Sequence, residues 1–187
     1  MSYQPAVFLD RDGVINFDPG YVYKIEEFQF VPGVFTACRE FIRLGYQIII
    51  ITNQSGIARG LYTVDDFKLL TKWMRAQFKD HGVEITDVYY CPHHDVYGKG
   101  QYKLDCNCRK PKPGMIKQAE TEHHINLQQS VLIGDTPGDI KAGKAAGIGK
   151  NYLVKTGKPV TNESLEIADG VYDDLLALFN SSILQSV

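Results

Sequence analysis

Residues 6–15 read Ala-Val-Phe-Leu-Asp-Arg-Asp-Gly-Val-Ile, an apolar run that ends in two acids separated by one residue. A run without polar alternation is typical of a strand buried on both faces at the centre of a parallel sheet. Such sheets bind ligands at the carboxyl ends of their strands, where Asp10 and Asp12 lie. Side chains two positions apart in a strand point to the same side, so both carboxylates can converge on one metal ion or phosphoryl group. Taken alone, the pair is also compatible with an ordinary Asp-Gly turn.

The composition is ordinary for a globular chain of this length. With 187 residues, 44% hydrophobic and 22% charged, we expect a single domain over residues 1–187 with a substantial core. The formal net charge of -2 gives no general basic surface, so we expect neither nucleic acid nor a membrane as a partner. No apolar run approaches the roughly 20 residues of a membrane span, and the N-terminus has no signal-like pattern. These features predict a cytoplasmic protein, which we expect to be a monomer.

Strand-like and helix-like patterns alternate along the chain. Buried strands are expected over residues 6–9, 47–52, 87–90, 130–134 and 151–154, and a short strand and helix over 168–179. Helices are expected over residues 33–44, 63–80, 115–123 and 137–146. This alternation predicts an α/β fold, a three-layer Rossmann-like parallel sheet between helices. Residues 13–31 are expected to form a short hairpin or flap over the acids, and residues 181–187 a flexible tail.

Polar side chains follow three of the predicted strands. Besides Asp10 and Asp12, Thr52 and Asn53 end the second strand, and Asp135 follows the fourth. Because the carboxyl ends of parallel strands share one edge of the sheet, we expect these groups to meet. Three carboxylates are suited to Mg²⁺, which prefers a few carboxylates together with water and phosphate oxygens.

Two further features are suited to phosphate. The hydroxyl of Thr52 and the backbone amides around Asn53 and Gln54 offer donors for phosphate oxygens. Lys110 stands just before a predicted helix and offers a point charge that would neutralise a phosphate and a crowded carboxylate.

In this order, the motifs resemble those of the haloacid dehalogenase superfamily of aspartate-nucleophile phosphatases. The matching motifs are Asp-x-Asp-Gly at 10–13, Thr-Asn at 52–53, Lys110 before a helix, and Gly-Asp-x-x-x-Asp at 134–139. The resemblance implies that Asp10 is the nucleophile, forming an aspartyl phosphate, and that Asp12 is the acid and base. It also implies that Mg²⁺ is held by Asp10, the backbone carbonyl of Asp12, and Asp135.

The remaining motif residues have supporting roles in this family. The resemblance implies that Thr52, Asn53 and Lys110 stabilise the phosphoryl oxygens. Asp139 is expected to orient Lys110 or a metal-bound water, with a surface acid in the first turn of a helix as the alternative.

A Cys-His loop, residues 91–108, contains a Cys-x-His and a Cys-x-Cys pair. Four soft ligands in two close pairs fit a closed, structural zinc site, with unligated or disulfide-bonded cysteines as the alternative. We expect this loop to deliver Arg109 and Lys110 to the site, and we keep His94 as an alternate ligand. The four selected zinc ligands are Cys91, His93, Cys106 and Cys108.

The Cys-His loop and the following Cys-Arg-Lys-Pro-Lys-Pro-Gly, residues 108–114, are similar to the histidinol-phosphate and heptose-bisphosphate phosphatase branch. This branch has only a minimal cap, so substrate choice must come from short loops. The Asn-Gln-Ser-Gly-Ile-Ala-Arg-Gly stretch at 53–60 resembles the heptose enzymes more closely. The resemblance implies removal of the 7-phosphate of a D-glycero-D-manno-heptose 1,7-bisphosphate, giving heptose 1-phosphate for nucleotide-activated heptose synthesis.

The expected substrate contacts come from the same resemblance. Arg59 and Arg109 are donors suited to a second, non-reacting phosphate, although either is also compatible with a surface charge. Thr136 stands where the family often has lysine, which removes one expected contact. Histidinol phosphate is the alternative substrate, and a non-catalytic zinc-stabilised phosphosugar-binding module is the alternative class. The expected contacts are Asp18, Pro19, Gly20, Tyr21, Asn53, Gln54, Ser55, Arg59, Arg109 and Lys110.

Overall fold

The computed structural model describes residues 3–181, which are built on one six-stranded sheet with the order β3-β2-β1-β4-β5-β6. Every neighbouring pair of strands runs parallel, which confirms the predicted α/β architecture. The order places β1 between β2 and β4, so the three strands that end in polar residues are neighbours. The strands are β1 (Ala6–Leu9), β2 (Gln47–Asn53), β3 (Asp87–Cys91), β4 (Val131–Gly134), β5 (Lys150–Val154) and β6 (Gly170–Tyr172).

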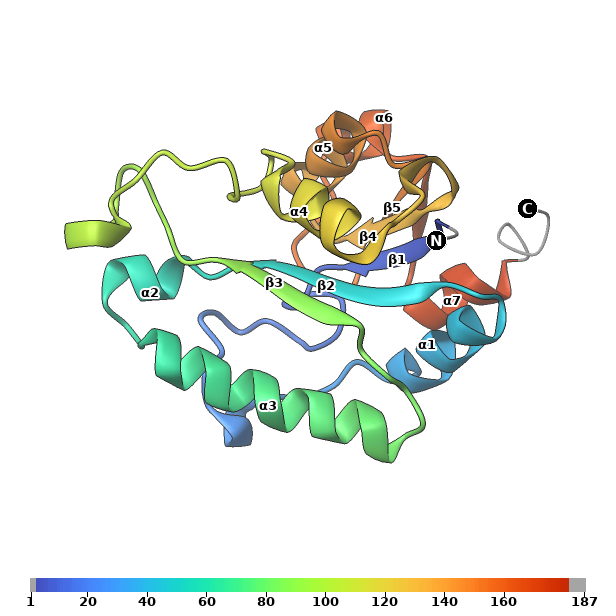
Figure 1. Ribbon diagram of the computed structural model, residues 1–187, viewed down its shortest axis with the longest axis horizontal. Coiled ribbons are helices and arrows are strands. Elements are labelled where there is room, and N and C mark those ends of the chain that lie inside the picture. The colour runs from blue at the N-terminus through green and yellow to red at the C-terminus, as the bar shows by residue number, and fades with distance from the viewer. Residues whose placement is uncertain (1–2, 182–187) are drawn as a thin grey trace.

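Helices cover both faces of the sheet (Figure 1). In β1, Val7 and Leu9 pack toward one face while Ala6 and Phe8 pack toward the other, and all four are fully buried. This confirms the expectation of a strand without a solvent-facing side. On the first face lie α1 (Val34–Arg43), α3 (Val64–Asp80) and α7 (Leu175–Asn180). On the second lie α4 (Gly114–His123), α5 (Pro137–Ala146) and α6 (Asn162–Ile167).

Capping and helix-terminating residues that are recognisable in the sequence set the ends of two helices. Thr63 and Asp66 form a reciprocal capping box at the start of α3, as expected, and the predicted apolar stripe of this helix is buried. In α5, Pro137 occupies the first turn, and Gly147 ends the helix in the left-handed conformation that glycine adopts without steric cost. The stripe of α3 consists of Phe67, Leu70, Met74 and Phe78.

Several short elements were not predicted, because a few residues carry no measurable periodicity. The flap, residues 13–31, has no paired strands and so is not a regular hairpin: Asn16 and Phe30 form one isolated antiparallel bridge. Residues 17–22 of the flap, in which Phe17 and residues 19–21 are exposed, are called the flap tip below. The predicted tail falls, beyond Ser181, outside the described residues. The unpredicted elements are α2 (Ser55–Arg59), α6 and the 3-10 helices η1 (Ile25–Glu27), η2 (Gly100–Tyr102) and η3 (Leu127–Gln129).

Within residues 3–181, no helix is both long enough and apolar enough to cross a membrane.

Candidate active site

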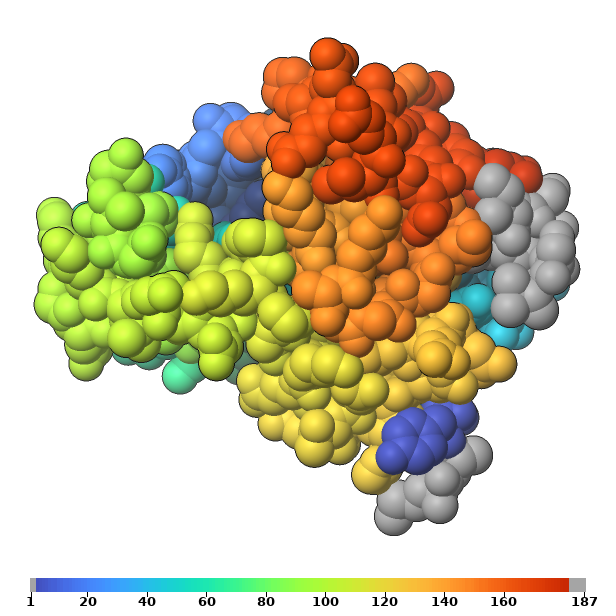
Figure 2. Space-filling model, turned by 90° about the horizontal axis from the view of Figure 1, so that it is seen from above, coloured from blue at the N-terminus to red at the C-terminus, as the bar shows by residue number. Residues whose placement is uncertain are grey.

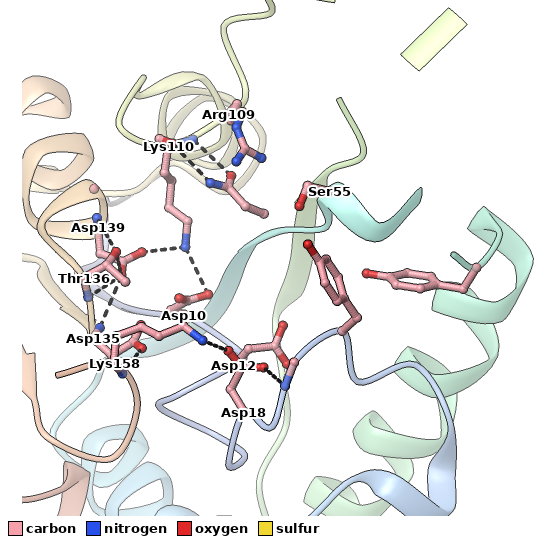
Figure 3. Close-up of a pocket in the computed structure, with 15 residues that line it drawn as sticks. Asp10, Asp12, Asp18, Ser55, Arg109, Lys110, Asp135, Thr136, Asp139 and Lys158 are labelled. Carbon is pink, nitrogen blue, oxygen red and sulfur yellow. Dashed lines mark hydrogen bonds and ion pairs between the residues drawn. The ribbon is translucent and has the colours of Figure 1, made fainter. Parts of the chain in front are cut away.

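The carboxyl ends of the central strands open into a cavity of about 400 Å³ (Figure 3). Asp10 follows β1, Asn53 ends β2 and Asp135 follows β4. Because these strands are neighbours in the sheet, residues far apart in the sequence meet at one edge. The predicted site residues that line the cavity are Asp10, Asp12, Asp18, Gly20, Tyr21, Asn53, Ser55, Arg109, Lys110 and Asp135.

Lys110 is a buried cation between two acids. Its Nζ lies 3.0 Å from Oδ1 of Asp10 and 2.6 Å from Oδ1 of Asp139, and it donates a hydrogen bond of 3.0 Å to the carbonyl of Ile51. Burial lowers the pKa of Lys110, but the charges of the two carboxylates outweigh burial and hold this pKa above its usual range. The side chain is therefore a fixed positive charge in the wall of the cavity.

Asn53 fixes the backbone on which Lys110 stands. Its Oδ1 accepts a hydrogen bond of 3.0 Å from the amide of Lys110, and its Nδ2 donates one of 3.1 Å to the carbonyl of the same residue. The sequence predicted a phosphate or substrate contact for Asn53. In the structure this side-chain amide joins the end of β2 to the segment before α4, and the substrate contact stays a prediction.

The acids around Lys110 form a cluster with an excess of negative charge. Carboxylate oxygens of Asp10, Asp135 and Asp139 lie within 4.8 Å of one another. Burial and the charge of Asp139 raise the pKa of Asp135 to about 6. Burial, Asp139 and Asp135 likewise raise the pKa of Asp10 well above its usual range, against the opposing charge of Lys110. The clustered carboxylate oxygens fit a hard divalent cation such as Mg²⁺, which would relieve the repulsion between the acids.

Asp139 is fully buried, so the prediction that it orients Lys110 agrees with its position and the surface-acid alternative is wrong. Its Oδ2 accepts hydrogen bonds from the amide and the hydroxyl of Thr136, at 3.0 Å and 2.7 Å. Thr136 in turn caps α5. Thr136 therefore orients Asp139, which in turn contacts Lys110.

A second set of contacts positions the carboxylate of Asp12. Arg11 is buried, and its Nε and Nη2 donate to Oδ1 of Asp12 at 3.1 Å and 2.9 Å. Gln54 donates from Nε2 to Oδ2 of Asp12 at 3.1 Å and to Oγ1 of Thr52 at 2.8 Å. Arg11 was not among the predicted site residues, because an arginine between two acids is typical of an exposed position.

Four predicted site residues lie outside the cavity lining. Thr52 and Gln54 are buried behind Asp12, and Pro19 borders a neighbouring hollow beside Phe17. The guanidinium of Arg59 lies 4.2 Å from the ring centroid of Tyr97, in the Cys-His loop, and 6.0 Å from that of Tyr21, in the flap tip. Arg59 therefore packs between the flap tip and the Cys-His loop, whereas Arg109 lines the cavity.

The four residues selected for zinc come together in space. Their ligand atoms lie within 4.8 Å of one another, with the Sγ atom of Cys108 at 3.0 Å from that of Cys91 and 3.5 Å from Nδ1 of His93. The cysteines form no disulfide among the described residues, and hydrogen bonding with Cys91 and Cys106 lowers the pKa of Cys108 to about 5. The donor set and spacing fit a tetrahedral zinc site, in which sulfurs surround the metal at about 2.3 Å. Nδ1 of His94 instead accepts from backbone amides within its own loop.

Lys158 and Tyr62 also line the cavity, and neither was predicted from the sequence. Lys158 follows β5, the strand next to β4, so its loop reaches the same edge of the sheet. Adjacency of strands could have indicated this loop, but the sheet order is not readable from one sequence. Tyr62 lies beyond α2, a helix too short to be predicted.

A parallel sheet whose carboxyl edge presents buried carboxylates around one lysine is suited to binding a phosphoryl group together with a divalent cation. The HAD-hydrolase-like family matches residues 107–178. A D-glycero-beta-D-manno-heptose-1,7-bisphosphate 7-phosphatase from Vibrio cholerae is 51% identical over 172 residues, covering 92% of each chain. The enzyme of the same name from Haemophilus influenzae is 50% identical, covering 92% of this chain and 94% of its own.

Solved structures agree with these sequence relatives. A D,D-heptose 1,7-bisphosphate phosphatase from B. bronchiseptica, complexed with magnesium and phosphate, superimposes with a TM-score of 0.81 at 26% identity. The match covers 97% of this chain and 99% of that one. The chain therefore belongs to the haloacid dehalogenase-like hydrolase family and is a phosphoric monoester hydrolase.

Proposed function

We propose that this chain removes the 7-phosphate of D-glycero-β-D-manno-heptose 1,7-bisphosphate and releases heptose 1-phosphate. The observation that carries the proposal is the pair of relatives with this activity in their names, which are 51% and 50% identical over 92% of this chain. The same names support the β anomer, which the sequence alone left open. The product would feed synthesis of nucleotide-activated heptose for a lipopolysaccharide core or a surface glycan.

Asp10 is the proposed nucleophile. Its Oδ1 accepts from the amide of Arg11 at 2.7 Å and contacts Nζ of Lys110 at 3.0 Å. Both contacts occupy Oδ1. We therefore assign the in-line attack on phosphorus to the other carboxylate oxygen, Oδ2. The bond to the sugar oxygen breaks, and the phosphoryl group is held as an aspartyl phosphate until water cleaves it.

Asp12 moves the protons in both steps. It donates a proton to the departing sugar oxygen and later accepts one from the attacking water. Its hydrogen bonds with Arg11 and Gln54 hold the carboxylate in one orientation at the cavity wall. Lys110 offsets the negative charge that builds up on the phosphoryl oxygens, a type of stabilisation that is often the largest contribution to catalysis.

The acid cluster is the proposed site of Mg²⁺. Asp10, Asp135 and the backbone carbonyl of Asp12 would hold the ion, which supplies positive charge against the repulsion between carboxylates and phosphate. Asp139 lies in the same cluster, but its contact with Lys110 at 2.6 Å assigns it to the lysine.

The substrate is proposed to lie between the flap tip and the start of α4. Asp18, Gly20 and Tyr21 line one side of the cavity, and Arg109 lines it near the Cys-His loop. Arg109 is a bidentate donor suited to the phosphate that does not react. Its Nη1 donates to the carbonyl of His93 at 3.4 Å, so zinc bound in the Cys-His loop would position this arginine.

The two alternative functions make different predictions for one assay. We would measure kcat/KM with Mg²⁺ on both anomers of the heptose bisphosphate, histidinol phosphate and fructose 1,6-bisphosphate. We expect kcat/KM for the β anomer to exceed that for the α anomer by about 100-fold or more, which is about 2.7 kcal/mol of transition-state discrimination. A preference for histidinol phosphate would support the alternative substrate, and no turnover of any compound would support a binding module.

The matched variants for this assay are Asp10→Asn and Asp80→Asn. The first keeps the shape of the side chain and removes the nucleophile, so we expect kcat to fall by about 10³-fold or more. The second changes an exposed acid at the end of α3 in the same way and should leave kcat unchanged.

A further inference from the structure

The flap tip borders the cavity and is anchored at its two ends. At one end, the amide of Phe17 donates to the carbonyl of Gln29 at 3.0 Å. At the other, the carbonyl of Val22 accepts from Nη2 of the buried Arg11 at 2.7 Å. Most residues between these anchors are exposed, so the tip depends on side-chain contacts to hold its position over the cavity.

Between these anchors, the side chain of Asp18 makes a polar contact with a distant part of the chain. Its Oδ2 lies 2.7 Å from Nζ of Lys158, while its Oδ1 accepts from the amide of Gly20 at 3.0 Å and shapes the turn (Figure 3). The side chain of Asp18 is only 14% exposed, against 55% for Lys158. Both side chains line the cavity, the aspartate more deeply buried and the lysine more open to solvent.

The other end of this contact is fixed by the loop after β5, residues 155–160, called the β5 loop. The amide of Lys158 donates to Oδ2 of Asp135 at 2.8 Å, and the hydroxyl of Thr156 donates to the carbonyl of Gly13 at 2.7 Å. A Cβ atom on Gly157 would lie 2.0 Å from Oδ2 of Asp135, so only glycine permits this approach. Figure 2 shows the orange β5 loop region beside the blue flap.

We propose that Lys158 is a positioning residue for the reaction: its side chain latches the flap tip through Asp18, while its backbone amide holds Asp135. This inference rests on the proposed function for the choice of substrate. One residue thereby links the loop that contacts the sugar to the acid beside the reacting phosphoryl group.

The two halves of the latch are separable by mutation. Replacing Lys158 by methionine removes the contact with Asp18 and keeps the backbone amide that faces Asp135. We therefore expect a higher KM for the bisphosphate, an unchanged Mg²⁺ concentration for half-maximal activity, and kcat within about twofold of wild type. A partly exposed ion pair has a modest effect, so the expected rise in KM is about 3- to 10-fold.

The matched control is Lys155→Met in the same loop. Lys155 pairs with Asp173 at the surface, at 2.9 Å, and both side chains are more than half exposed. This variant should leave KM unchanged. Lys158→Arg should restore most of the wild-type KM, because a guanidinium can reach the same carboxylate.

Two measurements test the latch itself. The first is a double-mutant cycle: Lys158→Met should raise KM in the wild-type chain and have almost no effect on KM in an Asp18→Ala chain, because the partner is already gone. The second is amide hydrogen exchange without substrate, which should be faster over residues 17–22 in Lys158→Met and unchanged in Lys155→Met.

Two outcomes would overturn the proposal. An equal rise in KM in both backgrounds would mean that Lys158 binds the substrate directly and not through Asp18. Unchanged exchange in the flap tip would remove the latch. If wild-type protein does not turn over the heptose bisphosphate, the proposed function fails, while the exchange measurement still decides whether Lys158 holds the flap tip.

Discussion

Replacing Lys110 by methionine tests the electrostatic design of the site. The variant keeps most of the volume of the side chain and removes the cation that lies 3.0 Å from Asp10 and 2.6 Å from Asp139. The lysine side chain is only 4% exposed, so water cannot replace its charge without a structural change. Two buried carboxylates are left without their shared partner.

The size of the effect follows from this burial. Removing one partner of a buried ion pair costs about 3–5 kcal/mol of unfolding free energy. For a chain of this length, each kcal/mol corresponds to about 2–4 °C in Tm, so a decrease of about 6–20 °C is expected. Loss of one preorganised donor to a developing negative charge lowers kcat by about 10²–10³-fold.

The decrease in stability should depend on pH with a definite sign. Lys110 lowers the pKa of Asp10, which burial and the neighbouring acids already raise, so this pKa rises further in the variant. An acid whose pKa is raised by folding contributes stability in its protonated form at low pH, and this contribution is lost as pH rises through the folded-state pKa. The loss is greater in the variant, where the pKa of Asp10 is raised further. The Tm difference between wild type and Lys110→Met should therefore be larger near pH 8 than near pH 5, as thermal unfolding in EDTA would show.

The control is Lys112→Met, two residues away, where an exposed lysine pairs with Asp105. It should change neither Tm nor kcat measurably. A Lys110→Met protein with a Tm within about 2 °C of wild type and kcat within about tenfold would refute the reasoning, because a fixed buried charge cannot be dispensable.

Three further outcomes are expected. Mg²⁺ at about 100 times its Kd at pH 7.5 should raise Tm by about 5 to 10 °C at that pH, and the same concentration should raise Tm by less near pH 5. The reason is that protons compete with the ion for Asp135, whose folded-state pKa of about 6 lies above the usual 3.8, so an equal rise at both pH values would contradict the carboxylate site. Cys108→Ser should lower the zinc content of purified protein well below the one ion per chain expected of wild type, as elemental analysis would measure, whereas Cys38→Ser, outside the cluster, should not. Gly157→Ala should raise the Mg²⁺ concentration for half-maximal activity, since its Cβ would displace Asp135; an unchanged Mg²⁺ dependence would contradict the close approach of the β5 loop.

The sequence was most informative where chemistry is local or where burial is continuous. The apolar run before Asp10 predicted a strand without a solvent-facing side, and Thr63 with Asp66 predicted the start of α3. The four zinc candidates were selected by spacing alone and lie together. Strand ends that share one edge of a parallel sheet brought Asp10 and Asp135 to the same cavity.

The contacts that depend on tertiary structure were out of reach. Which residue holds Asp18 is decided by the placement of β5 beside β4, and Lys158 lies 140 positions away in the sequence. Arg59 offered the chemistry of a phosphate ligand, yet the fold places it against the ring of Tyr97. A side chain's type predicts what it can bind, whereas its neighbours decide what it does bind.

The central claim is that Asp10 chemistry releases the 7-phosphate and spares the 1-phosphate. The most direct measurement is ³¹P NMR of D-glycero-β-D-manno-heptose 1,7-bisphosphate during turnover with Mg²⁺. We predict that the signal coupled to the two protons at carbon 7 is replaced by inorganic phosphate, while the doublet coupled to the anomeric proton persists. Loss of the anomeric phosphate signal, or a spectrum that does not change, would contradict the account.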